Sequence, residues 1–485
     1  MRGRTPRVAL GAGVVVLLAS FLLKAWQRGC VSQLTGEPAV NDLLIGLDGE
    51  ALSCAKLTAW LRKSGDIEHD QQVAAIEVVP GSERRWPQSH SAKLNLSLAS
   101  GAEDVEHIGG GNGERLLFLK KVLVTEAKLE SLPALRRDLA SNGNEVRFYE
   151  EFRDILSQRG LPLIKAIHVD SRLSFLDQNL DAAATDEVAL RGSGALFLLE
   201  SAEGYYQASP LSAKQAKTTL KLLANFHAAA WEDEELLVRA ANRLHPLAGY
   251  WTMQQRGREE MGRMAENWKG YVAAFAALRP ELFARPGIAE LAQRIERLAV
   301  WVSEELSTLP GQPFATLVHG DYKAMNIFLR EDLKETESQR FSPSPAYPSA
   351  ESDALLIDFQ WTGVGFGMSD VAMHLSHSVA VDALRDGGER SLVQGYHQEL
   401  LAAIGTSRAA AYTTEIAWRH YCLAVVDYAR MVLGCFFVNA SPQVFAARAQ
   451  QENVGLCYRD VEASFHFVER VDRSLRAIEE EALSS

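Results

Sequence analysis

Cysteine is scarce in this chain, and its scarcity excludes two ways of stabilising a fold. The 485 residues include only five cysteines, Cys30, Cys54, Cys422, Cys435 and Cys457. They are odd in number, widely scattered and free of any Cys-x-x-Cys or Cys/His spacing, so neither a disulfide framework nor a structural zinc site is expected. Buried or free thiols are predicted, with a single disulfide as the alternative.

Dense basic clusters are also absent. Lysine and arginine number 50 against 62 aspartates and glutamates, which gives a formal net charge of −12. No stripe of Lys and Arg is interleaved with aromatic residues, as binding to a nucleic-acid backbone would require, so nucleic acid is not an expected partner. A nucleotide remains compatible with this charge, because a few local cations, oriented amides and a metal ion set the field at a binding site.

One long apolar run stands out near the amino terminus. Three arginines within the first seven residues precede the run from Val8 to Leu23. The run is slightly long for the core of a signal peptide and slightly short for a bilayer span of about 20 residues. Because no small-x-small cleavage site follows it, an uncleaved anchor is favoured, and the preceding arginines would leave the short end cytosolic.

We therefore expect membrane association, or a secretory or organellar location, through residues 8–26. The alternatives are a buried amphiphilic helix and a segment removed during organelle targeting. Without such a role for this segment the protein is expected to be cytoplasmic.

The remaining composition, 47% hydrophobic and 23% charged, is that of an ordinary globular protein. Short strand-like runs at 73–79, 93–98 and 116–124, each bounded by Gly, Ser or Pro, predict an antiparallel sheet. A further apolar strand covers 195–199 and ends at Glu200, and the chain beyond it is predominantly helical. A small β-rich part followed by a large helical part predicts an α+β fold with two lobes.

The expected organisation has four parts. Residues 1–29 form the basic flank and hydrophobic segment, 30–72 a helical lead-in, 73–200 the smaller lobe and 201–485 the larger lobe. Within the larger lobe, residues 331–353 are rich in Glu, Ser and Pro and are predicted to form a disordered surface insertion.

A helix is predicted from Asn144 to Leu156. Its period places Glu145 on one face with Tyr149, Phe152 and Leu156. A carboxylate on an apolar stripe needs a partner, so Glu145 is expected to meet a cation.

The chemically informative region begins with a predicted strand at 315–318, which leads into His319-Gly320-Asp321-Tyr322-Lys323-Ala324-Met325-Asn326. A later apolar strand delivers Asp358 at its end, within Leu355-Leu356-Ile357-Asp358-Phe359-Gln360. Transfer of a γ-phosphoryl group requires a carboxylate that accepts the hydroxyl proton and oxygen ligands for a metal that bridges the phosphates. Asp321 suits the first role, and Asn326 and Asp358 suit the second.

The two segments HGDYKAMN and LLIDFQ resemble the aminoglycoside phosphotransferase and choline kinase-like superfamily, and they are most similar to its ecdysteroid kinase-like branch. The resemblance implies a protein-kinase-like fold and transfer of phosphate from ATP, with Mg²⁺, to a small hydroxyl compound. It implies that Asp321 is the catalytic base and that Asn326 and Asp358 hold the metal.

The segment Asn144-Glu145-Val146-Arg147-Phe148-Tyr149 resembles the helix of that family whose glutamate pairs with a strand lysine. Lys120 is the candidate lysine for the nucleotide phosphates, and Lys121 is its close competitor. Glu200, at the end of its strand, is a further nucleotide-binding candidate. Lys323 either contacts the transferred phosphoryl group or is exposed to solvent.

Other polar residues are assigned structural roles. His319 is expected to brace the catalytic loop, Asp370 to support it from the start of a helix, and His227 to be a satisfied core histidine. Asp427 and Arg430 either line the acceptor pocket or form an internal ion pair.

Two features depart from the family pattern. Asp358 follows Asp321 by 37 positions because of the polar insertion. The expected phosphate-covering loop at 81–91 contains a single glycine, which leaves its contacts with nucleotide open.

The acceptor is expected to be small. Eleven residues separate Asp358 from Asp370, too few for the activation segment and peptide platform of a protein kinase. A sterol-like alcohol, an amino alcohol and a sugar all remain open. The alternative function is a membrane-tethered, nucleotide-binding regulator without turnover, and the oligomeric state is not determined by the sequence.

Overall fold

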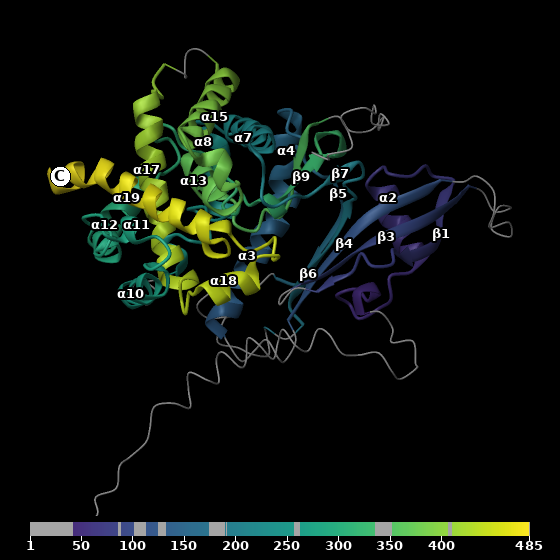
Figure 1. Ribbon diagram of the computed structural model, residues 1–485. Coiled ribbons are helices and arrows are strands. Elements are labelled where there is room, and N and C mark those ends of the chain that lie inside the picture. The colour runs from purple at the N-terminus through teal and green to yellow at the C-terminus, as the bar shows by residue number, and fades with distance from the viewer. Residues whose placement is uncertain are drawn as a thin grey trace, which may run out of the picture.

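The computed structural model describes residues 42–85, 89–100, 113–124, 132–173, 190, 192–256, 262–334, 352–405 and 410–484 (Figure 1). The predicted anchor at 8–26 and all but the two ends of the predicted insertion lie outside these ranges. No helix in the described ranges combines the length and the apolarity that crossing a bilayer requires. The anchor and the division into four parts therefore stay predictions.

The smaller lobe is built on one antiparallel sheet. Its strands are β1 (Gln71–Val78), β2 (Arg84–Arg85), β3 (Ser89–Ser100), β4 (Glu114–Leu123), β5 (Ala166–Ser171) and β6 (Gly194–Glu200). Their order is β1-β3-β4-β6-β5, and β2 pairs with the beginning of β3. The four predicted strands are present, whereas β5 was missed because only Ile167 of its six residues is buried, so it has no apolar alternation.

Both faces of this sheet are covered, which explains the unbroken apolar run of β6. Leu196 and Leu198 face a layer made by η1 (Asp42–Leu44) and α2 (Cys54–Lys63), while Ala195, Phe197 and Leu199 face the main core. Alternate side chains of a strand point to opposite faces, so a strand covered on both sides must be apolar throughout. The described part of the predicted lead-in is thus a layer packed on the sheet.

The helix on the other face begins earlier than predicted. It runs as α3 (Leu132–Arg147), a π-helical turn η4 (Phe148–Phe152) and α4 (Arg153–Gln158). The polar run from Ser141 to Asn144 is typical of a helix start, but here Ser141 and Asn142 bond back to the Asp138 carbonyl and Asn144 bonds to the other lobe. These local and tertiary hydrogen bonds satisfy the polar side chains, so the helix continues without a break through residues 141–144.

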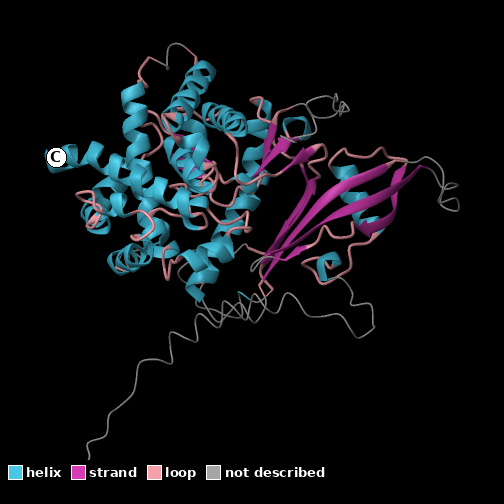
Figure 2. Ribbon diagram, in the orientation of Figure 1, coloured by secondary structure: helices cyan, strands magenta, loops and turns pink. Residues whose placement is uncertain are grey.

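The larger lobe is mainly helical, and Figure 2 shows that most of the sheet structure lies in the smaller lobe. Its longer helices are α7 (Ala213–Ala228), α8 (Glu234–Arg243), α10 (Met264–Phe275), α12 (Leu291–Leu306), α13 (Met368–His377), α15 (Gly388–Ile404), α17 (Thr414–Met431), α18 (Pro442–Arg448) and α19 (Val461–Ser484). Short strands β7 (Tyr205–Tyr206), β9 (Ile327–Arg330) and β10 (Ala354–Leu356) form one small sheet, and β8 (Thr316–Val318) pairs with β11 (Gly363–Gly365). The α+β fold with two lobes is confirmed.

The cysteines do not cross-link the described chain. Cys54, Cys422 and Cys457 are free thiols, and Cys422 and Cys457 are buried. The prediction of thiols is therefore confirmed for these three, while Cys30 lies outside the described residues.

Several histidines of the larger lobe are buried in the neutral form. Burial lowers the pKa of His245, His374 and His420 to about 4 each and that of His466 to about 3, because a charged imidazole would lose its hydration. In the unfolded chain a histidine has a pKa of about 6.5. The unfolded chain therefore binds more protons than the folded chain between these values.

This difference predicts acid sensitivity in a defined window. We expect the free energy of unfolding to be fully present above about pH 6.5 and to fall as the pH is lowered toward about 4, since protons bind preferentially to the unfolded histidines. Urea unfolding at a series of pH values measures this dependence of the free energy of unfolding on pH. Substitution His374→Gln should make the fall shallower, and substitution of the exposed His69 by Gln should not; a stability independent of pH in this window would contradict the assignment.

Candidate active site

The loop that carries Asp321 is held from behind by Asp370. This loop follows β8. The backbone N–H groups of His319 and Gly320 donate to the Asp370 carboxylate at 2.7 and 2.9 Å. Gly320 has a φ of +76°, and a Cβ there would lie 2.2 Å from the Trp361 carbonyl oxygen, so only glycine fits. Asp370, in the first turn of α13, thus fixes the path of the loop, as expected.

Two histidines near the loop have structural partners. His319 donates from Nε2 to the Ile357 carbonyl at 3.0 Å, and its Nδ1 accepts the Asp321 N–H at 3.3 Å. His227 bonds to the Tyr396 hydroxyl at 2.6 Å and to Asp370 at 3.2 Å. With both nitrogens of each ring engaged, the geometry agrees with the bracing role expected for His319 and the core role expected for His227.

Asp321 is buried and faces two polar neighbours. Its Oδ2 lies 3.0 Å from Lys323 Nζ and accepts a hydrogen bond from Asn326 Nδ2 at 3.1 Å. Burial raises the pKa of Asp321, and the charge of Asp358 adds to this while that of Lys323 opposes it. Lys323 is not solvent-exposed: its side chain is 16% accessible, and the two carboxylates raise its pKa against the effect of burial.

Lys120 joins the lobes. Its Nζ lies 2.7 Å from Glu145 on α3 and 3.1 Å from Asp358 of the larger lobe. Lys121, the next residue of β4, points to the opposite face and donates to the carbonyls of Asp42 and Ile45 at 2.9 and 2.6 Å. The lysine that meets Glu145 is therefore Lys120.

The charges of this group depend on one another. Burial raises the pKa of Glu145 to about 7, with Lys120 opposing and Asp358 reinforcing the shift. Burial also acts to raise the pKa of Asp358, but the charges of Lys120 and Lys323 hold it below its ordinary value. Asp358 is thus an ionised carboxylate at neutral pH, as a metal ligand must be.

The segment after Asp358 is clamped between the lobes. Asn144 of α3 donates to the carbonyls of Phe359 and Thr362, each at 3.0 Å. The Phe359 ring stacks on Phe148 at 3.7 Å and lies 6.3 Å from Phe226 of α7. These contacts hold Asp358 in a left-handed conformation with a φ of +69°.

Asn326 lies beside Asp358 because their strands pair. The Ile357 N–H donates to the Asn326 carbonyl at 3.1 Å, and β9 and β10 are antiparallel neighbours. Among the described residues no group of three His, Cys, Asp or Glu could hold a metal ion. An amide oxygen and a carboxylate are ligands that Mg²⁺ accepts alongside phosphate oxygens and water, so Asn326 and Asp358 would fit such an ion.

Glu200 stands apart from these residues. It ends β6, where its side chain is 41% exposed and lies 3.7 Å from Arg115. The structure does not bring it to the Lys120 group, and a nucleotide contact by Glu200 stays a prediction.

Two further findings concern the pair Asp427 and Arg430, for which the sequence left two roles open, and Asn144. Asp427 and Arg430 form the internal ion pair, at 3.0 Å, and Arg430 also donates to the Trp251 carbonyl. Asn144 was not anticipated as a site residue. The sequence offered one signal for a role of Asn144, its position directly before Glu145. Adjacent residues of a helix point in different directions, so Glu145 can bind Lys120 while Asn144 binds the segment after Asp358.

Replacing Asp370 tests how the loop is held. Asp370→Asn leaves one oxygen for two backbone N–H groups, so we expect the free energy of unfolding to fall by about 2–3 kcal/mol. Urea unfolding measures this, with Asp382→Asn as the control, since that side chain is 89% exposed. Equal stability of the two variants would contradict the support assigned to Asp370.

Comparisons with known proteins identify part of the chain. Residues 195–407 match the model of the ecdysteroid kinase-like family. No curated protein matches the chain.

The solved structures that match this chain are distant from it. A choline kinase from Streptococcus pneumoniae is 11% identical, with 88% of this chain and 100% of that chain covered and a TM-score of 0.34. A Plasmodium vivax ethanolamine kinase is 12% identical, with 97% and 95% covered and a TM-score of 0.35. At these TM-scores the likenesses carry no argument about function. The resemblance predicted from the two motifs is nevertheless confirmed, since residues 195–407, which contain Asp321, Asn326 and Asp358, match the ecdysteroid kinase-like family.

Proposed function

We propose that the chain transfers the γ-phosphoryl group of ATP, with Mg²⁺, to a hydroxyl group of a small molecule. The observation that carries the proposal is the convergence of a paired lysine, Lys120, a buried carboxylate, Asp321, and the adjacent Asn326 and Asp358. The match of residues 195–407 to the ecdysteroid kinase-like family supports it.

Each residue has a distinct task in this proposal. Lys120 would contact the nucleotide phosphates while Glu145 keeps its ammonium group in place. Asn326 and Asp358 would hold the magnesium ion. Bound ATP would supply the phosphoryl group, and the magnesium ion would neutralise the charge that develops on it.

Asp321 would accept the proton of the acceptor hydroxyl. Its raised pKa makes it a stronger base than an ordinary aspartate, and general bases of this kind typically contribute roughly 10²–10⁴-fold to a rate. Lys323, 3.0 Å away, would orient the carboxylate and face the transferred group.

A small acceptor is favoured by the path of the chain after Asp358. β11 pairs with β8 at Gly363–Gly365, and α13 begins at Met368. The residues between Asp358 and Asp370 are therefore used inside the larger lobe, and none extends to form a peptide-binding platform. Membrane association through residues 8–26 is a separate prediction that this argument does not need.

The test is product formation by the full chain. Incubation with ATP, Mg²⁺ and a pool of small alcohols should give a product heavier by one phosphoryl group (HPO₃), detected by mass spectrometry. Asp321→Asn should lower the rate by roughly 10²–10⁴-fold, and the exposed control Asp382→Asn should not.

The contrary result would favour the other function. A chain that binds ATP and Mg²⁺ but yields neither phosphorylated alcohol nor ADP would contradict the proposal and favour a nucleotide-binding regulator. Equal rates for Asp321→Asn and the wild type would contradict the role of Asp321 as base.

A further inference from the structure

Two buried polar atoms of the larger lobe have no hydrogen-bond partner in the described part of the chain. They are Nδ1 of His377 and Nε of Arg459, on residues that are each 3% exposed. An unpaired buried polar atom costs roughly 1–3 kcal/mol, so such atoms are rare in folded proteins and demand an explanation.

His377 directly precedes a residue that is hydrogen-bonded to the loop that carries Asp321. It is the last residue of α13, and the next residue, Ser378, accepts the Ala324 N–H on its hydroxyl at 2.8 Å. Burial lowers the pKa of His377, and the charges of Lys323 and Arg459 lower it further. His377 is therefore a buried, neutral ring, and its neighbour in space is Tyr458, the residue before Arg459.

Arg459 approaches from the other side. It follows η9 (Leu456–Tyr458), and its Nη2 donates to the Ser209 hydroxyl at 2.6 Å. Within the described part of the chain no carboxylate forms an ion pair with it; the acidic groups that act on it, Glu452 and Asp460, are both exposed at the surface. The guanidinium of Arg459 is therefore buried, and its Nε–H donates no hydrogen bond.

Tyr458, the residue before Arg459, lies beside His377. Its ring is 6.1 Å from that of His377 and stacks on Phe436 at 4.3 Å. A Cβ at Gly455 would lie 2.6 Å from the Tyr458 ring and 2.9 Å from the His377 ring. The close approach of these rings therefore requires glycine at 455.

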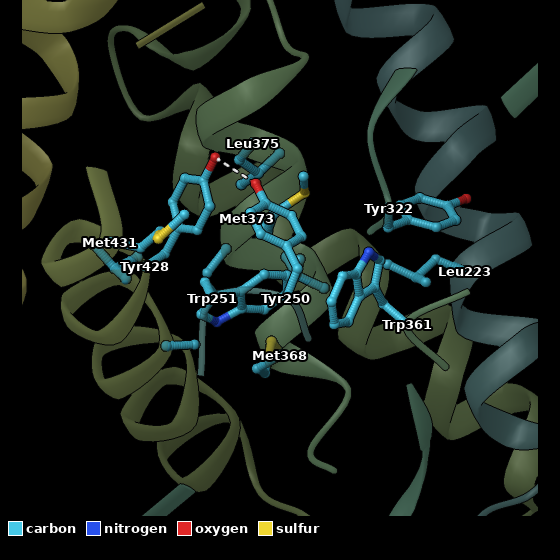
Figure 3. Close-up of a cluster of buried hydrophobic side chains, with 14 of the residues drawn as sticks. Leu223, Tyr250, Trp251, Tyr322, Trp361, Met368, Met373, Leu375, Tyr428 and Met431 are labelled. Atoms are coloured by element: carbon cyan, nitrogen blue, oxygen red, sulfur yellow. Dashed lines mark hydrogen bonds between the residues drawn. The ribbon is translucent and has the colours of Figure 1, made fainter. Parts of the chain in front are cut away.

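An aromatic wall lies next to the same loop. Tyr250 donates its backbone N–H to the Gly320 carbonyl at 3.3 Å, and its hydroxyl lies 3.4 Å from that of Tyr428. Figure 3 shows these two rings with Trp251 and Trp361 in one buried cluster. Apolar rings beside a few unpaired polar atoms are the composition of a small-molecule site.

We propose that His377 and Arg459 bind an oxygen-bearing group of the acceptor, such as a second hydroxyl, a carbonyl or a carboxylate. The inference rests on the proposed function and specifies its acceptor. Nε–H of Arg459 would donate to the oxygen, and the neutral imidazole would donate or accept. The neighbouring charges of Lys323 and Arg459 favour oxygen and disfavour an ammonium group at this point.

Kinetics with matched acceptors test the proposal. The alcohols that the full chain phosphorylates are compared as pairs of similar size, one member with a second oxygen group and one without. His377→Leu and Arg459→Met should raise the KM of the oxygen-bearing member by roughly 10- to 100-fold and erase the preference for it, with the KM of ATP unchanged. A rise in the KM of ATP instead would assign the pair to the phosphate and overturn the proposal.

Stability gives a second test that does not depend on turnover. His374, one turn earlier on α13, has both ring nitrogens partnered, by Thr219 and by the Tyr322 carbonyl at 2.9 Å each. His374→Leu should therefore lower the midpoint temperature of unfolding, whereas His377→Leu should leave it unchanged or raise it, because it removes an unpaired polar atom. An equal loss in both variants would show a structural role for His377 and overturn the proposal.

The two hypotheses fail in different ways. No product from any alcohol with the wild-type chain would overturn the proposed function and this inference with it. Product formation that is insensitive to both substitutions would overturn this inference alone.

Discussion

The structure depends on one partly buried cation. The ammonium group of Lys120 belongs to the sheet, Glu145 to the helix that packs on it, and Asp358 to the larger lobe, so one group orders three elements that are far apart in the sequence. Removing the lysine would leave two buried carboxylates facing each other without compensation. The same arrangement leaves the ammonium group at the junction of the lobes, where an anionic nucleotide can be bound.

The carboxylates of the site are positioned by residues that take no part in the proposed chemistry. Asp370 holds the loop of Asp321 by its backbone N–H groups, and Asn144 holds the segment after Asp358 by its carbonyls. Both residues act by hydrogen-bonding to backbone N–H or C=O groups and not to the catalytic side chains. Asp321 and Asp358 are consequently free to face the junction of the lobes, and their electrostatic environment is set by Lys120 and Lys323.

Much of this arrangement could be predicted from the sequence, within physical limits. Strands with strong apolar patterns and the polar loop after β8 were located, because their signals are local. The choice between Lys120 and Lys121 was not local: it depends on which face of β4 meets α3. The helix was predicted to begin at Asn144 but begins at Leu132, and the bonds that satisfy Asn144 inside it come from a segment more than 200 positions away. That Nδ1 of His377 and Nε of Arg459 have no hydrogen-bond partner likewise shows only in three dimensions.

The central claim is that Lys120, held by Glu145 and Asp358, binds the nucleotide. Isothermal titration of MgATP into Lys120→Met and Lys121→Met tests it most directly, since the two residues are neighbours on opposite faces of β4. We expect Lys120→Met to weaken binding by about tenfold or more, the cost of a hydrogen bond to a charged group, and Lys121→Met to bind as the wild type does. Wild-type affinity in Lys120→Met would contradict the account.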